Sequence, residues 1–240
     1  MKTGAGVLQR PESRLNALHN RHLGETCVLV CNGLSLNQMD LSFLRRQVCI
    51  GLNKIFLGIR TFKFYPRYYV AVNQKVIAQS ASEIRALNAV KFIGSKGHSI
   101  VAEDALTFHV NTSSPPGRFS KDLAQGAHEG WTVTHVALQV AYYLGFHKVV
   151  IIGMDHRYAF SGPANQASLL QGPDPNHFSP AYFSGQQWDN PDLEESEESY
   201  RIAKEVFQAD GREILDATVN GACRVFPKVD YRAQFGLMAA

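Results

Sequence analysis

The sequence predicts an α/β protein with a mostly parallel, Rossmann-like sheet that is flanked by helices. Residues 26–31 form a continuous apolar run of strand length, and residues 147–153 form the strongest strand pattern of the chain, which is typical of strands buried on both faces of a parallel sheet. Segments with the apolar spacing of helices separate these and other strand-like runs. Because such strands are joined by right-handed crossovers, ligands are expected in the loops at the carboxyl ends of the strands.

The first part of the chain alternates between the two kinds of element. Apolar residues at helical spacing, with Pro11 near one start and Gly24 after one end, predict three helices, over residues 11–22, 37–46 and 74–87. Short apolar runs predict four strands, over residues 26–31, 48–52, 67–73 and 91–94.

The second part of the chain contains the clearest helix, over residues 131–144, which Gly145 closes as a carboxyl-terminal cap. The strongest strand, a polar helix and a last strand follow it, over residues 147–153, 193–209 and 213–217. Two stretches lack periodicity. Residues 95–129, with a turn at 115–117, are predicted to form an irregular insertion, and residues 154–191 a lid, since loops this long are uncommon without a role.

The composition is that of a globular protein. The chain has 240 residues, of which 45% are hydrophobic and 19% charged, and its net charge is +3 with neutral histidines. Disordered chains combine low hydrophobicity with high net charge, and dedicated nucleic-acid binders usually carry a denser basic patch. We therefore expect no nucleic-acid partner. We expect one α/β domain over residues 26–231, preceded by a helical extension over residues 1–25.

Two absences bear on location and metal binding. No stretch approaches the ~20 apolar residues of a membrane span, and residues 1–24 carry charges where a signal peptide needs its apolar region. We therefore expect a cytoplasmic protein. The cysteines lack the spacing of a zinc site and are expected to be small buried hydrophobic residues: Cys27, Cys31, Cys49 and Cys223.

Polar residues follow the predicted strands at the edge where a ligand would lie. Asn32, Asn53 and Asn73 each end a strand, and an asparagine offers both a donor and an acceptor to a base, a ribose or a phosphate. Gly33 would let the backbone approach a ligand closely, and Ser35 could cap the next helix. The alternative is an ordinary strand-to-helix turn, with asparagines that simply favour strand ends.

Two further groups lie in or beside the predicted lid. Asp155 could orient a sugar hydroxyl or a metal, and the next three residues, His156, Arg157 and Tyr158, could bind a phosphate. His177 is a candidate general base, because histidine side chains can take up a proton near neutral pH. The alternatives are a charged surface loop and a solvated histidine. The chain has no GxGxxG, Walker A, GxSxG or DxD motif.

In order along the chain, these motifs resemble those of the bacterial lipooligosaccharide sialyltransferases. They also resemble the related 6-hydroxymethylpterin diphosphokinase-like superfamily, which includes the flagellar motility accessory factors. The resemblance spans roughly residues 26–231, and short segments carry it: residues 31–36 with Asp40, 130–133, 144–145, 150–155, 158–160 and 176–177. It implies a sheet similar to the A-type glycosyltransferase fold, without a DxD metal site.

The resemblance also implies roles for single residues. His177 would be the general base, and Tyr158 would bind the leaving phosphate. Arg157 would replace a second phosphate-binding tyrosine that has no equivalent here, and Leu34 stands where the family has proline. Donor binding is assigned to eight residues: Asn32, Gly33, Ser35, Asn53, Asn73, Trp131, Thr132 and Asp155.

The leading hypothesis is therefore a sialyltransferase-like glycosyltransferase of cell-surface glycan or lipopolysaccharide synthesis. It would take a nucleotide sugar, in this family one linked to CMP, and a glycan or another hydroxyl acceptor, without a further cofactor or a metal. One alternative is an Mg-ATP-dependent diphosphokinase in which Asp155 becomes a metal ligand. Another is a non-catalytic nucleotide-binding module in surface or flagellar assembly.

The sequence leaves two partners open. The enzyme could associate peripherally with a membrane. The aromatic tail around Phe226 and Tyr231 could pack either on the core or on a second subunit of a homo-oligomer.

Overall fold

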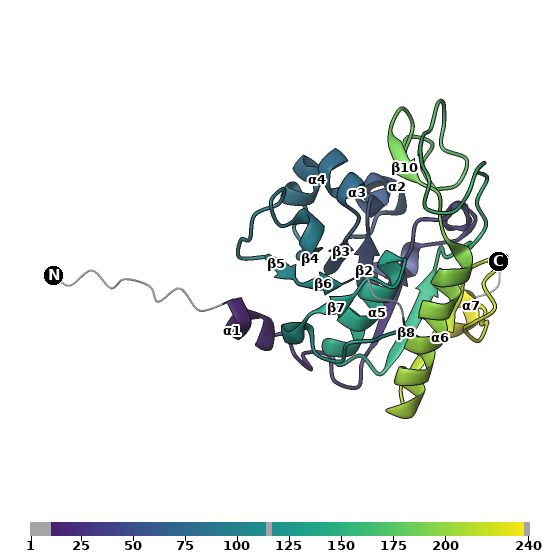
Figure 1. Cartoon of the computed structure of the whole chain (residues 1–240). Coiled ribbons are helices and arrows are strands. Elements are labelled where there is room, and N and C mark those ends of the chain that lie inside the picture. Colours follow the sequence, from purple (N-terminus) through teal and green to yellow (C-terminus); the bar gives the residue numbers. More distant parts are fainter. Residues whose placement is uncertain (1–10, 114–116, 238–240) are drawn as a thin grey trace.

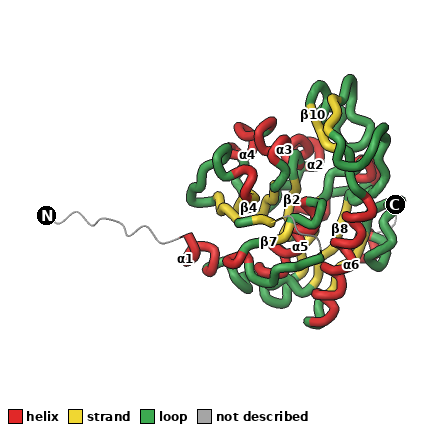
Figure 2. The backbone as a smooth tube through the Cα atoms, viewed as in Figure 1, coloured by secondary structure: helices red, strands yellow, loops and turns green. Residues whose placement is uncertain are grey.

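A seven-stranded sheet runs through the centre of the molecule, with helices on both faces (Figures 1 and 2). The computed structural model describes residues 11–113 and 117–237. All neighbouring strands of the sheet are parallel. In spatial order they are β11 (Glu213–Asp216), β8 (Lys148–Ile152), β1 (Thr26–Val30), β2 (Val48–Leu52), β3 (Tyr68–Ala71), β4 (Val90–Gly94) and β5 (Thr107–Val110). The predicted fold class is confirmed.

The strand order reverses direction at β1. From β1 the chain adds β2 to β5 on one side, and it later adds β8 and β11 on the other. The loops that leave the carboxyl ends of β1 and β8 therefore diverge. In open parallel sheets this switch point leaves a crevice where ligands bind.

Strand residues pack alternately against two cores, because successive side chains of a strand point to opposite faces. In β1, Cys27 and Leu29 belong to one buried cluster, and Val28 and Val30 belong to the other. Both faces of the sheet are covered, which is why the run is apolar at every position. The structure therefore confirms the expectation that β1 is buried on both faces of the sheet.

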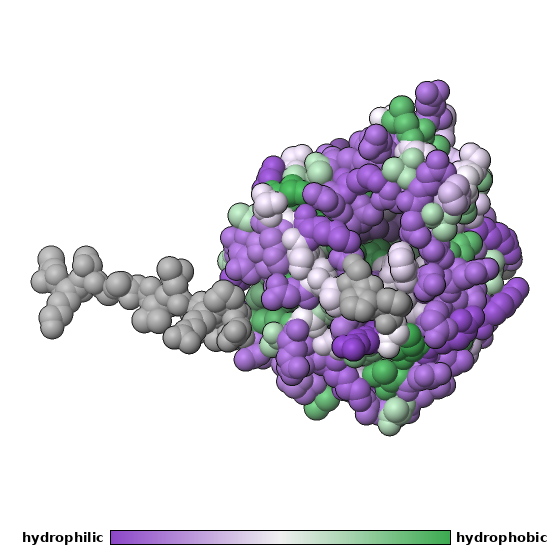
Figure 3. Space-filling view, in the orientation of Figure 1, coloured by the Kyte–Doolittle hydropathy of each residue, from purple (hydrophilic) through white to green (hydrophobic). Residues whose placement is uncertain are grey.

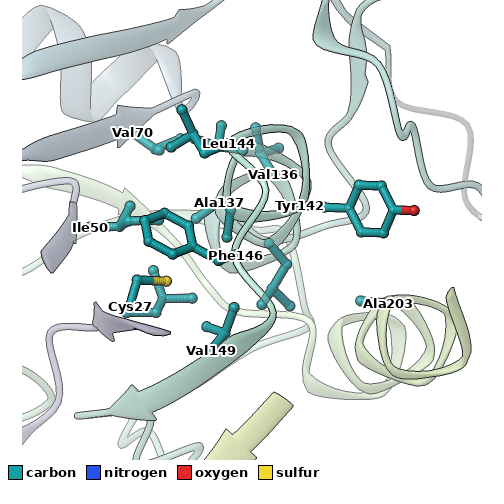
Figure 4. Close-up of a cluster of buried hydrophobic side chains, with 14 of the residues drawn as sticks. Cys27, Ile50, Val70, Val136, Ala137, Tyr142, Leu144, Phe146, Val149 and Ala203 are labelled. Carbon is teal, nitrogen blue, oxygen red and sulfur yellow. The ribbon is translucent and has the colours of Figure 1, made fainter. Parts of the chain in front are cut away.

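The first core lies under the two long helices, α5 (Val133–Tyr143) and α6 (Leu193–Ala209). Figure 4 shows strand residues such as Ile50 and Val149 facing Ala137 of α5. Ten of the eleven residues of α5 are buried, so the helix is held by the sheet on one side and by α6 on the other. The predictions for both helices are confirmed to within two residues.

The second core lies under short elements on the opposite face. These are turns and helices of four to six residues: α2 (Ile59–Phe62), α3 (Gln74–Gln79), α4 (Ala81–Ala86), α7 (Tyr231–Gln234) and the 3₁₀ turns Leu34–Gln38, Ser42–Arg46 and Ile55–Gly58. Residues of the lid, including Phe178 and Trp188, join the same cluster.

Three predicted helices are shorter than the sequence suggests. The leading helix, α1 (Pro11–Asn16), ends before residue 22. The single helix expected over 37–46 is instead the two 3₁₀ turns, because the carboxylate of Asp40 accepts the backbone N–H of Ser42 and interrupts helical bonding (3.0 Å). The helix expected over 74–87 is divided at Ser80 into α3 and α4.

The prediction that residues 95–129 are an irregular insertion is wrong. This stretch supplies β5, the edge strand of the main sheet, and the two short paired strands β6 (Thr112–Ser113) and β7 (Ala127–His128). Two polar residues, Thr107 and His109, interrupt the apolar run of β5, so the sequence signal is weak. The turn predicted at 115–117 lies mostly outside the described residues.

The lid contains a small antiparallel pair, β9 (Ala167–Leu169) and β10 (Gln187–Asp189), within otherwise irregular chain. The tail that follows β11 packs on this chain's own core, since Phe226 and Tyr231 are both buried there. Within the described residues, no helix is both long and apolar enough to cross a membrane.

Candidate functional site

A cavity of about 530 Å³ lies at the carboxyl ends of the strands, between the lid and the amino-terminal ends of α5 and α6. Residues that follow β1 and β8 line it, so it occupies the crevice at the switch point of the sheet. Figure 3 shows a hollow in the largely hydrophilic surface of this face, below the protruding lid. The volume suits a ligand of nucleotide size.

The structure brings together most of the residues that the sequence singles out. Eight of them line the cavity: Asn32, Asn53, Asn73, Trp131, Thr132, His156, Tyr158 and His177. They come from six separate segments of the chain, so their convergence is a product of the fold. Gly33, Ser35, Asp155 and Arg157 are not among the lining residues.

Two of the asparagines present unsatisfied oxygen atoms. Asn32 donates from Nδ2 to the carbonyl oxygen of Leu52 (3.2 Å). The Oδ1 atoms of Asn32 and Asn53 are both buried without a hydrogen-bond partner among the described residues. Because an unsatisfied buried acceptor costs roughly 1–3 kcal/mol, two of them beside one cavity indicate a ligand that donates hydrogen bonds.

Asn73 has a different role in the fold. Its Oδ1 accepts the backbone N–H of Val76 (3.2 Å), which caps the first turn of α3. Its Nδ2 donates to Asp189 of the lid (3.5 Å). The side chain is thus already occupied, although the residue lines the cavity.

The start of α5 forms a second wall of the cavity. Thr132 caps this helix by accepting the N–H of Thr134 (3.3 Å), and its hydroxyl also lies 3.4 Å from the hydroxyl of Tyr200. The free N–H groups and the dipole of a helix start favour anions. Trp131, just before the cap, has a left-handed backbone (φ 65°) and is 47% exposed.

Gly33, Ser35 and Asp155 shape the loop after β1. The Asp155 carboxylate accepts hydrogen bonds from the backbone N–H of Ser35 (3.0 Å) and from its hydroxyl. A Cβ atom on Gly33 would lie 2.3 Å from Asp155 Oδ1 and 2.7 Å from the carbonyl oxygen of Gly153, so only glycine fits. Asp155 is therefore engaged by the scaffold, and Arg157 is exposed outside the cavity.

His177 forms a dyad with Asp174, a residue that the sequence argument does not single out. Nδ1 of His177 lies 2.9 Å from Asp174 Oδ2, and the imidazole stacks on Tyr182 with ring centroids 3.9 Å apart. A β-bridge joins His177 to Gly33, and the N–H of Phe178 donates to the carbonyl oxygen of Asn32 (3.0 Å). The lid thus carries its histidine directly against the loop after β1.

The Asp174 carboxylate is fixed by three hydrogen bonds. Besides Nδ1 of His177 it accepts the N–H groups of Asn176 (2.7 Å) and Phe183 (3.1 Å). Burial raises the pKa of Asp174, but these hydrogen bonds outweigh burial and hold the pKa below its usual value. An ionised Asp174 makes Nδ1 the protonated nitrogen of a neutral His177, which leaves Nε2 as a proton acceptor.

Tyr158 lies beside this dyad, with its ring centroid 6.1 Å from that of His177. Desolvation raises the pKa of the Tyr158 hydroxyl, and the neighbouring Cys31, Asp155 and Asp174 raise it further. The hydroxyl therefore stays protonated and can donate a hydrogen bond to an anion.

The structure adds charged pairs that the sequence argument does not anticipate. Lys75 pairs with Asp189, and Lys96 with Glu129, at the rim of the cavity. Of these pairs, only Asp174 and His177 are close in sequence, at i and i+3, so only their pairing could have been suspected from the sequence. The two lysine–carboxylate pairs join residues that are tens of positions apart. Among residues 11–113 and 117–237, no three His, Cys, Asp or Glu side chains form a group that could hold a metal ion.

Comparisons with known proteins agree with this architecture. No protein-family model and no curated protein matches the sequence. The structure is similar to that of the MAf glycosyltransferase from Magnetospirillum magneticum AMB-1, with a TM-score of 0.53 and 12% sequence identity. The match covers 95% of this chain and 39% of that one, so this chain spans well under half the length of that protein. The chain therefore has the α/β fold seen in a glycosyltransferase structure.

Proposed function

We propose that this protein is a glycosyltransferase that uses a nucleotide-activated sugar. The observation that carries the proposal is the Asp174–His177 dyad, held against a cavity at the switch point of the sheet, where two asparagine oxygens have no partner in residues 11–113 and 117–237. The likeness to the MAf glycosyltransferase supports the same class of reaction.

The walls of the cavity suit the two halves of such a donor. The amide groups after β1 and β2 can bind base or ribose hydroxyls, and the start of α5 favours the phosphate. His177 lies in the lid, beside the loop after β1. Its Nε2 would take the proton from the acceptor hydroxyl as that oxygen attacks the anomeric carbon. The bond from that carbon to the phosphate breaks, and its electron pair leaves with the phosphate oxygen.

The finer assignment is to a CMP-linked donor and to cell-surface glycan synthesis, as in the sialyltransferases. Short motifs support it, with Tyr158 as a donor to the leaving phosphate. The diphosphokinase alternative requires Asp155 as a metal ligand, yet this carboxylate already holds Ser35 by two hydrogen bonds. Releasing it for a metal would free the loop after β1, so the geometry favours glycosyl transfer.

A thermal-shift screen with CMP, CTP, UDP, GDP and ATP, each with and without Mg²⁺, tests the class of ligand. A nucleotide at 100 times its Kd should stabilise the protein by ~2.7 kcal/mol. We expect a response to a cytidine nucleotide that does not depend on Mg²⁺. A response to ATP only with Mg²⁺ would support the diphosphokinase instead, and silence across the panel would contradict nucleotide transfer.

His177→Ala should abolish transfer while leaving nucleotide binding intact. General-base help typically contributes 10²–10⁴-fold, so turnover should fall by about that factor with little change in the nucleotide Kd. Hydrolysis of CMP-sugars and calorimetry with CMP measure the two quantities. His147→Ala is the matched control, because His147 is exposed at the start of β8, at the far end of the strand from the cavity. Full turnover in His177→Ala would exclude the assigned role.

A further inference from the structure

A second histidine, His156, lines the same cavity and belongs to a second histidine–carboxylate pair. Its Nε2 lies 3.1 Å from Glu197 Oε1 on α6. Its side chain is only 7% exposed, and Nδ1 has no hydrogen-bond partner among the described residues. One ring nitrogen is therefore anchored, and the other has no partner among the described residues in a side chain that lines the cavity.

The backbone that presents His156 is held from two directions. His156 has a left-handed conformation (φ 54°), which is uncommon for a residue other than glycine and indicates a constrained position. The preceding Asp155 is fixed through its side chain by Ser35 and through its carbonyl oxygen by the N–H of Ala222 (2.9 Å). This turn directs His156 to the cavity, whereas Arg157 is exposed.

The charges around His156 come from three elements. Glu197 and Tyr200 lie on α6, Asp216 lies on β11, and Lys228 lies in the tail. Burial lowers the pKa of His156, and Lys228 lowers it further, while Glu197 and Asp216 act in the opposite direction. The free imidazole is thus easily neutral, and a bound anion beside Nδ1 would favour its protonated form.

We propose that His156 binds the phosphate of the nucleotide donor beside Tyr158, and that its imidazolium donates from Nδ1 to that phosphate. The proposal rests on the proposed function. Of the three adjacent residues that the sequence offers for the phosphate, it selects His156 as the cation in place of Arg157, which does not line the cavity. When the bond between the anomeric carbon and the phosphate oxygen breaks, the electron pair stays on the phosphate. The charge-assisted hydrogen bond from Nδ1 stabilises that charge, and His156 neither gains nor loses a covalent bond.

Paired titrations of a nucleotide and its nucleoside isolate the phosphate contact. Calorimetry with CMP and with cytidine is carried out on the wild type and His156→Gln between pH 6 and 8. We expect His156→Gln to weaken CMP by about 10- to 100-fold at pH 6.5, as for a lost hydrogen bond to a charged group, and to leave cytidine unchanged. The wild type should bind CMP more tightly as the pH falls, relative to the variant, because the imidazolium form binds.

Glu197→Gln separates the phosphate contact from a structural role. Removing this carboxylate should lower the pH at which the extra CMP affinity appears, while the affinity for cytidine is unchanged. His147→Gln, which changes a residue outside the cavity, should alter the affinity for neither CMP nor cytidine. If CMP does not stabilise the protein in the thermal-shift screen, the nucleotide that does so replaces CMP in these titrations, and its nucleoside replaces cytidine.

The outcomes distinguish this inference from the proposed function. Wild-type protein that binds no nucleotide overturns both. Wild-type protein that binds CMP, with an unchanged CMP affinity in His156→Gln, overturns the role of His156 alone. An equal loss of CMP and cytidine in that variant also overturns it, because the side chain would then only support the cavity wall.

Discussion

Tyr68 and Tyr69 are adjacent in β3, both fully buried, and point to opposite faces of the sheet. The Tyr68 hydroxyl lies 2.8 Å from Nε2 of His22, so it is paired inside the first core. The Tyr69 hydroxyl is buried in the second core with no partner among the described residues. A hydroxyl group contributes to stability only when its hydrogen bonds are made.

Tyr69→Phe should therefore stabilise the protein, and Tyr68→Phe should destabilise it, by about 1 kcal/mol each. The first change removes an unpaired buried hydroxyl without opening a cavity. The second leaves His22 without its partner. Urea unfolding of both variants measures the free energies of unfolding, and each variant is the other's control for loss of a hydroxyl. A loss of stability in Tyr69→Phe would show that this hydroxyl is paired.

Single residues of the site were predictable where local sequence carried the signal. Asn32, Asn53 and His177 follow recognisable segments and reach the cavity. Their partners were not predictable, because contacts such as the one between His156 and Glu197 join residues 41 positions apart. Sequence also does not tell which of two adjacent side chains, His156 or Arg157, faces inward, since this depends on one backbone φ angle.

At the scale of elements, the lid is fastened to the helical face of the second core. Lys54, which is buried, donates from Nζ to the carbonyl oxygen of Tyr182 (2.8 Å), to Gln79 (3.0 Å) and to Gln186 of the lid. Gln79 in turn donates to the carbonyl oxygen of Gln187 (2.7 Å). All of these acceptors are neutral, so the ammonium group is buried and has no paired carboxylate in the part of the chain that the structure describes.

This arrangement predicts a stability that rises in alkaline solution. Burial lowers the pKa of Lys54 to about 8, although Asp174 and Glu83 act to raise it, whereas an unfolded lysine has a pKa of about 10.4. Between these pH values the unfolded chain binds the extra proton, so stability increases with pH, by ~1.4 kcal/mol for each pH unit between the two pKa values. Below pH 8 and above about 10.4 the contribution is flat.

Lys54→Met tests this, because methionine fills a similar volume without a charge. The difference in melting temperature between wild type and Lys54→Met should shift in favour of the wild type as the pH rises from 8 to 10.4. Lys63→Met, at an exposed position, is the control and should show no such trend. A pH-independent difference for Lys54→Met would mean that the buried lysine keeps its ordinary pKa.

Helices and strands were predictable where their apolar pattern was long and was not interrupted by polar residues. Helices α5 and α6 and the fully apolar strands were identified with nearly correct bounds. Short 3₁₀ turns imitate helical spacing over two turns, so residues 37–46 were misassigned. Strand β5 was missed because it lies at the sheet edge and carries polar residues, which an edge strand tolerates and a central strand does not.

The whole molecule follows from the alternation of strands and helices. That alternation implies a parallel sheet, the sheet order places the switch point at β1, and the switch point places the cavity. The lid closes this crevice by contacts that no periodicity encodes, namely the dyad, the bridge to Gly33 and the bonds of Lys54. The position of the cavity in the fold was therefore predictable from the sequence, and the contacts that close the lid over it were not.

The protein's two tryptophans both line the cavity, so its intrinsic tryptophan fluorescence reports on that site alone. Trp131, at the start of α5, is 47% exposed, whereas Trp188 is buried within the fastened lid. We expect a bound nucleotide to quench the fluorescence of Trp131 by contact with its exposed ring, and to change the fluorescence of Trp188 little. Titration of CMP into Trp188→Phe should then keep the wild-type response, and titration into Trp131→Phe should lose it. The reverse pattern would mean that binding moves the lid, and that the hydrogen bonds from Lys54 to Tyr182 and Gln186 open when the nucleotide binds.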